Sequence, residues 1–334
     1  MTRGDLVSLF GRVAAALPFS RHVQQPERMR RIGVLSYFKE QDPDSNAYVA
    51  AFLKQLAEFG WTVGNNVQVD YRWTACDAER IHQYAAELVA LAPDVILAPT
   101  NSHVWPLRQI TSTIPIVFVQ VGGLSGGSIT SLASQSDNAT GFTSFEFDLS
   151  ARWLELLKQM APRTTRVAVL RDPGIRMGRN WPVPLTLARS LNVDVGPVDL
   201  GLGVGEASEI KRGIADFAEM PNGGLIVLPS AFSIAYRELI IALAHEHRLP
   251  AIYACRDFVV EGGLMSYGHD VVEQYRRAAG YVDYILNGVK PFELPVKEST
   301  KLELVINRKA AKTLGLEVPP SLISAAEVIE DVGD

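Results

Sequence analysis

The sequence contains little cysteine and no strong excess of charge of one sign. Only two cysteines, Cys76 and Cys255, occur among 334 residues, and the net charge is −5. One falls in each predicted half of the chain, so we predict no disulfide, and no cysteine cluster indicates a metal site. The acidic balance argues against a nucleic-acid partner held by its phosphates. After residue 30, no apolar run reaches the roughly 18 residues expected of a membrane-spanning helix.

Motifs for catalysis or metal binding are weak. Residues 123–127 have the spacing of a nucleophile elbow around Ser125, but β-branched and hydroxyl residues follow where an esterase needs a helix. A flexible loop is therefore the favoured interpretation. His245 and His247 would face different sides of a helix, which does not suit one metal ion. Residues 201–205 lack the spacing of a dinucleotide loop, and a turn is favoured. We predict no catalytic residue, no metal and no cofactor.

Residues 93–123 form the most informative stretch of the chain. Two short apolar runs, 95–98 and 116–121, are rich in β-branched residues and bounded by Pro and Gly, which is typical of strands buried on both faces. The segment between them has room for one helix, over about 104–112, so the two strands should be parallel neighbours. Small polar residues, Thr100, Asn101 and Ser102, follow the first strand, and Gln120 and Gly122 lie at or just past the end of the second. Open α/β sheets bind ligands at such carboxyl ends.

The same pattern recurs in the second half of the chain. Residues 224–230 read as an apolar strand closed by Pro229 and Ser230, a helical run over 233–247 follows, and residues 249–255 open the next strand after Pro250. The first strand predicted for each half, at 31–36 and at 166–171, also has a similar sequence. The fold class predicted from this repeat is α/β, with two Rossmann-like lobes that each contain a parallel sheet.

Helix signals and a late apolar run define the predicted boundaries. Ser45, Asp77 and Asp270 are placed to cap helices. Residues 262–268 are predicted as a strand that leads back to the first lobe. We expect a signal-like segment at 1–28, a first lobe of residues 29–142 plus 264–296, and a second lobe of residues 143–263 plus 297–330.

The first 30 residues resemble a degraded export signal. Residues 6–19 are mostly apolar and rich in Ala, as the centre of a signal peptide would be, but Arg12 interrupts them and no small-residue cleavage site follows. We predict poor export by this leader.

Several segments together resemble the ABC-transporter substrate-binding family that includes tryptophan and tyrosine binders. The similar segments are residues 29–35, 87–96, 113–119, 140–143, 222–229, 262–268, 303–307 and 319–321. The resemblance covers about residues 29–330. It implies the type I periplasmic-binding-protein fold, in which two lobes joined by a multi-crossover hinge close on a small ligand. The loop at 101–105 differs from the family pattern, and the segment 172–181 is variable in the family. Both are expected to face the cleft, so the identity of the ligand does not carry over.

The expected function is the solute-binding component of an ABC importer. The resemblance implies permease subunits as partners and a periplasmic location, and we expect a monomer that binds an amino-acid-like or carboxylate ligand. The expected ligand-binding residues are Ser36, Tyr37, Thr100, Asn101, Ser102, Gln120, Gly122, Thr143, Asp172, Ser230, Tyr253, Arg256 and Tyr267. Two alternatives stay open from the residues alone: a serine hydrolase that uses Ser125, and a cytoplasmic ligand sensor.

Overall fold

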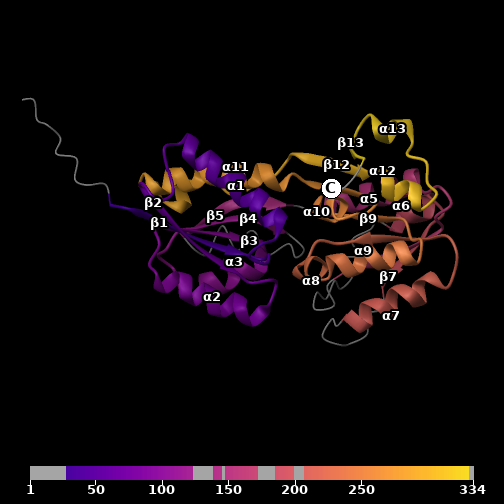
Figure 1. The fold of residues 1–334 in the computed structure, drawn as a ribbon, viewed down its shortest axis with the longest axis horizontal. Helices are drawn as coiled ribbons and strands as arrows, with labels where there is room; N and C mark the ends of the chain where they lie inside the picture. Colours follow the sequence, from indigo (N-terminus) through magenta and orange to yellow (C-terminus); the bar gives the residue numbers. More distant parts are fainter. Residues whose placement is uncertain (1–27, 123–137, 145–146, 172–184, 199–206, 331–334) are drawn as a thin grey trace, which may run out of the picture.

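Two α/β lobes lie side by side along the long axis of the molecule (Figure 1). The computed structural model describes residues 28–122, 138–144, 147–171, 185–198 and 207–330. Each lobe has one central sheet with helices on both of its faces, as the repeated strand–helix pattern predicts. Among the described residues, no helix is both long enough and apolar enough to cross a bilayer.

The first lobe is built on a six-stranded sheet in the order β11-β5-β4-β3-β1-β2, with every pair parallel. Its strands are β1 (Arg30–Ser36), β2 (Val67–Trp73), β3 (Val95–Pro99), β4 (Ile116–Gly122), β5 (Ala139–Ser144) and β11 (Lys297–Glu298). Strands β3, β4 and β5 are buried almost throughout, which explains the nearly continuous apolar sequences of β3 and β4.

Two helix pairs cover the faces of this sheet. The helices are α1 (Pro43–Glu58), α2 (Ala78–Ala90), α3 (Thr100–Ile110), α11 (Val271–Leu286) and the short η1 (Pro291–Glu293). Helices α1 and α11 pack together on one face, whereas α2 and α3 cover the other (Figure 1). Because α11 is far from α1 in the sequence, this half of the core forms only once the chain has returned from the second lobe.

The second lobe has a seven-stranded sheet in the order β13-β12-β10-β9-β8-β6-β7. Its strands are β6 (Arg166–Leu170), β7 (Asp194–Pro197), β8 (Gly223–Val227), β9 (Ala251–Tyr253), β10 (Met265–His269), β12 (Leu302–Asn307) and β13 (Glu327–Ile329). The pair β10–β12 is antiparallel, and all other pairs are parallel.

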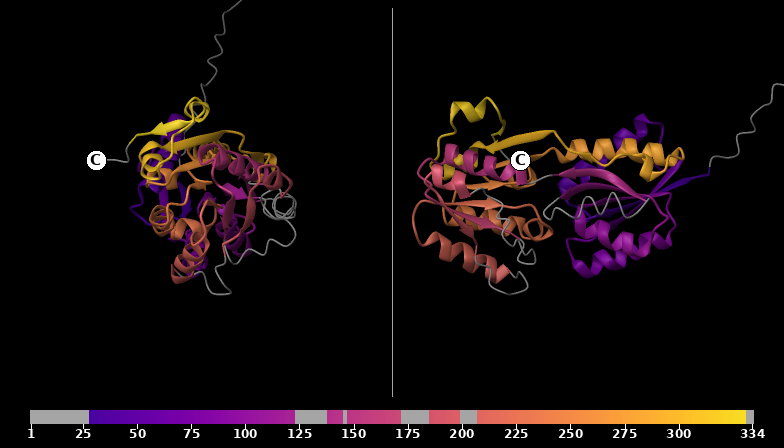
Figure 2. Two further views of the ribbon diagram at one scale, coloured as in Figure 1. Left: turned by 90° about the vertical axis from the view of Figure 1, so that its right-hand side faces the viewer. Right: turned by 180° about the vertical axis from the view of Figure 1, so that it is seen from behind.

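Helices cover both faces of the second sheet as well. They are α5 (Phe147–Met160), α6 (Leu185–Ser190), α7 (Ala207–Ala218), α8 (Ala231–Ala235), α9 (Arg237–Glu246), α10 (Asp257–Val260), α12 (Arg308–Thr313) and α13 (Pro320–Ile323). One core cluster joins the sheet to α5, α6 and α12, and the other joins it to α7 and α9. Figure 2 shows the C-terminal helices lying over this lobe only.

Three segments connect the lobes, and hydrogen bonds hold them together. The chain crosses after β5, after β10 and between β11 and β12. The backbone N–H of Ser299 donates to Thr143 O at 2.8 Å, and that of Asp270 donates to Lys301 O at 3.0 Å. An ion pair of 2.8 Å between the side chains of Asp270 and Lys301 adds to the second contact. The crossovers therefore form a compact strip on which a hinge motion can occur.

The structure differs from the predicted boundaries at two strands. Met265–His269 was placed in the first lobe, but it pairs with β9 and β12 in the second sheet. Residues 297–298 were placed in the second lobe, but they pair with β5 in the first. The local sequence of a strand does not identify the sheet it joins, which is the reason for both errors.

Local capping signals gave mixed results. Asp77 and Asp270 accept hydrogen bonds from the backbones of Arg80 and Glu273, so the predicted caps of α2 and α11 are confirmed. Ser45 is not a cap, because α1 begins at residue 43 and the carboxylate of Asp42 accepts from the Ser45 amide at 3.4 Å.

Candidate functional site

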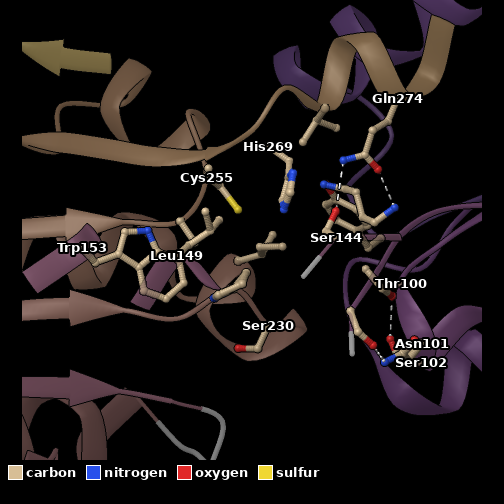
Figure 3. A pocket seen from close by; sticks show the side chains of 18 residues that line it. Thr100, Asn101, Ser102, Ser144, Leu149, Trp153, Ser230, Cys255, His269 and Gln274 are labelled. Carbon is tan, nitrogen blue, oxygen red and sulfur yellow. Dashed lines mark hydrogen bonds between the residues drawn. The ribbon is translucent and has the colours of Figure 1, made fainter. Parts of the chain in front are cut away.

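A cavity of about 290 Å³ lies between the lobes, at the carboxyl ends of the strands (Figure 3). The residues that the first lobe contributes are mainly polar and uncharged: Tyr37, Thr100, Asn101, Ser102, Gln120, Gly122, Ser144, Val271 and Gln274. The residues from the second lobe are mainly apolar: Leu149, Trp153, Pro229, Ser230, Ile234, Ala254, Cys255, Gly268 and His269. The volume lies just below the range of about 300–1,000 Å³ that is usual for pockets that bind small organic ligands.

Thr100 is held in an unusual backbone conformation at the end of β3. Its φ is 53°, a left-handed value that is costly for a β-branched residue. The Thr100 hydroxyl lies 2.9 Å from Nδ1 of His103, which is fully buried. This contact fixes the first turn of α3 against the strand end and presents Asn101 and Ser102 to the pocket.

The protonation state of His103 follows from its partners. The hydroxyl of Thr74 donates to Ser36 O at 2.9 Å, so Thr74 accepts from Nε2–H of His103 at 3.0 Å. Nδ1 is then the bare nitrogen and accepts from the Thr100 hydroxyl. Burial lowers the pKa of His103 to about 3, so the ring stays neutral at physiological pH. Its role is to orient Thr100 rather than to supply charge.

The second lobe supplies an apolar wall centred on Trp153. This side chain is only 1% exposed, and its indole N–H donates to Tyr267 O at 2.6 Å. The polar group of the ring is thus already satisfied within the lobe, and Figure 3 shows Trp153 and Leu149 together on the side opposite Thr100. An aromatic ring and a branched aliphatic chain favour an apolar ligand group.

The pocket has little formal charge. Among its described lining residues there is no Lys, Arg, Asp or Glu. Burial raises the pKa of Tyr37 well above its ordinary value, so this hydroxyl is neutral. Over the described part of the chain, no group of three or more His, Cys, Asp or Glu side chains is placed to hold a metal ion. A charged ligand group would therefore meet hydrogen-bond donors and dipoles rather than a counter-ion.

Comparison with known proteins decides the family. A model of the family described as "ABC transporter substrate binding protein" matches residues 32–329. The chain belongs to this family. Members of the family are non-enzymatic binders, which agrees with the prediction that the protein is not an enzyme and argues against the hydrolase alternative.

Two relatives of this substrate-binding protein carry ligand names. It is 22% identical over 300 residues to the tyrosine-binding protein of Clostridioides difficile (strain R20291), covering 87% of this chain and 82% of the relative. The crystal structure of an ABC domain from Streptococcus pneumonia in complex with L-Trp is 20% identical, with a TM-score of 0.75 over 90% of this chain and 99% of that one.

A more distant similarity concerns the fold alone. An arabinose-binding protein from Geobacillus stearothermophilus is 14% identical and has a TM-score of 0.56, covering 85% of this chain and 99% of that one. The two-lobed periplasmic-binding-protein fold expected from the sequence is thereby confirmed.

Seven of the predicted ligand-binding residues of the substrate-binding protein come together around the pocket. They are Tyr37, Thr100, Asn101, Ser102, Gln120, Gly122 and Ser230. All seven lie at or just beyond the carboxyl end of a strand, where parallel strands direct their loops to the same side of a sheet. Asp172 lies outside the described residues, as do Ser125 and residues 201–205.

Five predicted residues do not line the pocket. Ser36 is buried, and its hydroxyl accepts from the Phe38 amide at 3.3 Å. Thr143 faces the β11 crossover, and Tyr253 stacks on Phe258 inside the second lobe. The other two are Arg256, which is bound to Glu327 and Glu303, and Tyr267, which packs against the core. Arg256 is thus engaged in a cluster of its own and does not face the ligand cavity.

Sequence reasoning missed the residues that approach the pocket from helices and crossovers. Leu149 and Trp153 come from α5, Gln274 comes from α11, and Ser144 ends β5 before the first crossover. The usable signal was their position next to a predicted crossover, because such segments must pass the cleft between the lobes.

Proposed function

We propose that this substrate-binding protein binds an α-amino acid with a large apolar side chain in the pocket between its lobes. The observation that carries the proposal is the division of the pocket, with neutral hydrogen-bonding groups on the first lobe and an apolar wall around Trp153 on the second. An aromatic amino acid has the matching distribution of polar and apolar groups. The names of the tyrosine-binding and L-Trp-bound relatives support this choice.

The N-terminal end of α3 offers a place for the ligand carboxylate. The residue that precedes the helix is Pro99, and no side chain caps the helix there. Asn101 instead donates to Gly122 O at 2.9 Å, and Ser102 lies 3.0 Å from the Thr100 hydroxyl. The first-turn N–H groups at the positive end of the helix dipole can therefore serve an anion, together with the exposed Ser102 hydroxyl.

The wider role that follows is delivery of the amino acid to the permease of an ABC importer. Permease subunits are the expected partners, and a periplasmic location is the expected setting. The family assignment supports both, since its members are substrate-binding components of such transporters. Residues 1–27, which include most of the predicted export signal, lie outside the described part of the chain.

Calorimetry with L-tryptophan and L-tryptophanamide tests the proposal. We expect the wild type to bind the acid at least about tenfold more tightly than the amide, because a hydrogen bond to a charged group contributes about 1.5–3 kcal/mol. Ser102→Ala should weaken binding of the acid by about the same factor and binding of the amide much less. Ser190→Ala is the matched control, since its hydroxyl donates to Leu187 O far from the pocket. Equal affinity for acid and amide would exclude the carboxylate site, and failure to bind L-tryptophan or L-tyrosine would contradict the proposed function.

Cys255 provides a second, chemical test of pocket occupancy. Cys255 lines the cavity, whereas Cys76 donates to Tyr37 O at 3.3 Å and has its pKa raised to about 12 by burial. In a Cys76→Ser variant, L-tryptophan at about 100 times its Kd should slow alkylation of Cys255 by N-ethylmaleimide up to about a hundredfold, because only about 1% of the pockets stay free. The rate is measured by mass spectrometry. An unchanged rate at saturation would place the ligand elsewhere.

A further inference from the structure

An irregularity in β4 brings Gln120 to the pocket. Phe118 pairs with Gly141, but the next pair is Val121 with Thr143, so two residues of β4 stand opposite one residue of β5. Such a bulge bends a strand and redirects a side chain. Gln120 lies within it, has a left-handed φ of 54° and lines the cavity. A bulge of this kind takes a backbone N–H out of the regular ladder, and that N–H then needs another acceptor.

The side chain of Gln274 supplies this acceptor. Gln274 lies in the first turn of α11, just after the second crossover, and is fully buried. Its Oε1 accepts from the Gln120 backbone N–H at 2.9 Å, and its Nε2 donates to the Ser144 hydroxyl at 3.1 Å (Figure 3). Because Oε1 must face an N–H donor, the orientation of the amide is fixed by its partners. The Gln274 side chain thus accepts the hydrogen bond of the backbone N–H at the bulge and also contacts the last residue of β5.

We propose that Gln274 is a positioning residue that sets the affinity of the pocket by holding Gln120 and Ser144 in place. The inference rests on the proposed function, since it concerns the same site. Gln120 and Ser144 both line the cavity, yet each stands next to a chain irregularity: the bulge for Gln120 and the first crossover for Ser144. A left-handed glutamine is strained and persists only where neighbouring groups hold it. Without Gln274, the Gln120 N–H would be buried without its acceptor.

The position of Gln274 also links the pocket to the hinge. It joins the end of β4, the end of β5 before the first crossover and the start of α11 after the second. A change in the angle of the crossovers therefore moves Gln274, and with it the pocket residues Gln120 and Ser144. The same two hydrogen bonds of Gln274 therefore influence both the ligand contacts of Gln120 and Ser144 and the angle between the lobes.

Three substitutions test the proposal by calorimetry with L-tryptophan. Gln274→Leu removes both hydrogen bonds and should weaken binding at least about tenfold. Ser144→Ala removes one of them and should weaken binding less. Gln274→Glu is the informative variant, because a carboxylate would place an uncompensated charge at a fully buried position, whereas a protonated carboxyl can accept from Gln120 and donate to Ser144 as the amide does. Burial raises the pKa of a carboxyl group, so the affinity of this variant should recover towards that of the wild type as the pH falls from 8 to 5.

Asn138 provides a matched control for a purely structural role. It is a buried amide of the same lobe whose Nδ2 donates to Ile114 O at 2.9 Å, and it does not line the pocket. Asn138→Leu should lower the melting temperature without changing the affinity for L-tryptophan.

The inference is overturned if Gln274→Leu binds as tightly as the wild type, if both leucine variants lose affinity equally, or if Gln274→Glu shows no recovery at low pH. If Gln274→Leu does not fold, the affinity of Ser144→Ala and the pH profile of Gln274→Glu test the proposal in its place. A wild type that binds neither L-tryptophan nor L-tyrosine contradicts the proposed function, and the inference falls with it.

Discussion

Replacing Arg237 with methionine is expected to lower the free energy of unfolding by about 3–5 kcal/mol at pH 7. The Arg237 side chain is only 7% exposed and makes two hydrogen bonds to the carboxylate of Glu261, one of them Nε to Oε2 at 2.6 Å. It also lies 3.5 Å from Asp42 of the first lobe. Removing its charge would leave several carboxylates clustered at the contact between the lobes.

The reason for so large an effect is the burial of Asp257 in the same cluster. Asp257 is 5% exposed and accepts a hydrogen bond from the Tyr48 hydroxyl of the first lobe. Burial raises the pKa of Asp257 from 3.8 to about 6, while Arg237 acts to lower it and Asp42 and Glu261 act to raise it. Losing one partner of a buried charge network costs more than a surface pair contributes. The control is Arg308→Met, which breaks an exposed pair with Glu330 and should cost less than about 1 kcal/mol.

The cost of Arg237→Met should shrink as the pH falls. A carboxyl whose pKa is raised by folding contributes its full stability below its unfolded pKa, and that contribution is lost as the pH rises through the folded value. For Asp257 the window lies between 3.8 and about 6. Near pH 4 the native carboxyl is protonated and no longer needs the guanidinium. Urea denaturation at pH 7 and pH 4.5 measures the difference. A cost below about 1 kcal/mol at pH 7, or one that grows in acid, would contradict this account of the cluster.

Gly141→Ala is expected to destabilise the protein by about 3 kcal/mol or more, because a β-carbon has no space there. It would lie 2.0 Å from Phe118 O and 2.7 Å from Phe118 N, and the residue has a φ of +151°. The obstacle is backbone rather than a flexible side chain, so β4 itself would have to move. Gly141 stands opposite the residue at which the bulge begins, and the same change should weaken binding of L-tryptophan by displacing Gln120.

Gly196→Ala is the matched control for this prediction. Gly196 also lies in a strand, but a β-carbon there would meet no atom within 4 Å, and its φ is not in the left-handed region. We expect a change within about 0.5 kcal/mol, or slight stabilisation through the unfolded chain. Thermal and urea denaturation compare the two variants. If both are equally stable, the close approach of β5 to β4 is not a constraint on the fold.

Short-range patterns in the sequence determined much of the architecture. The apolar runs at β3, β4 and β8 end at Pro or Gly, and small polar residues follow the first and the last of them; those signals depend only on neighbours in the sequence. The repeat of this pattern predicted two similar lobes. It also placed seven of the pocket residues, because the carboxyl end of a parallel strand is identified once the strand is known.

Tertiary structure alone decided how these parts combine. Strand β10 joined the second sheet and ran antiparallel to β12, which no feature of its own sequence predicts. Trp153 and Gln274 entered the pocket from helices, and Gln274 reaches Gln120 across 154 positions of the chain. The bulge at Gln120 and the charge cluster at Arg237 are likewise contacts between distant segments. Propensities and caps act over a few residues, whereas a pocket between lobes depends on packing and hydrogen bonds that exist only after the crossovers have brought both lobes together.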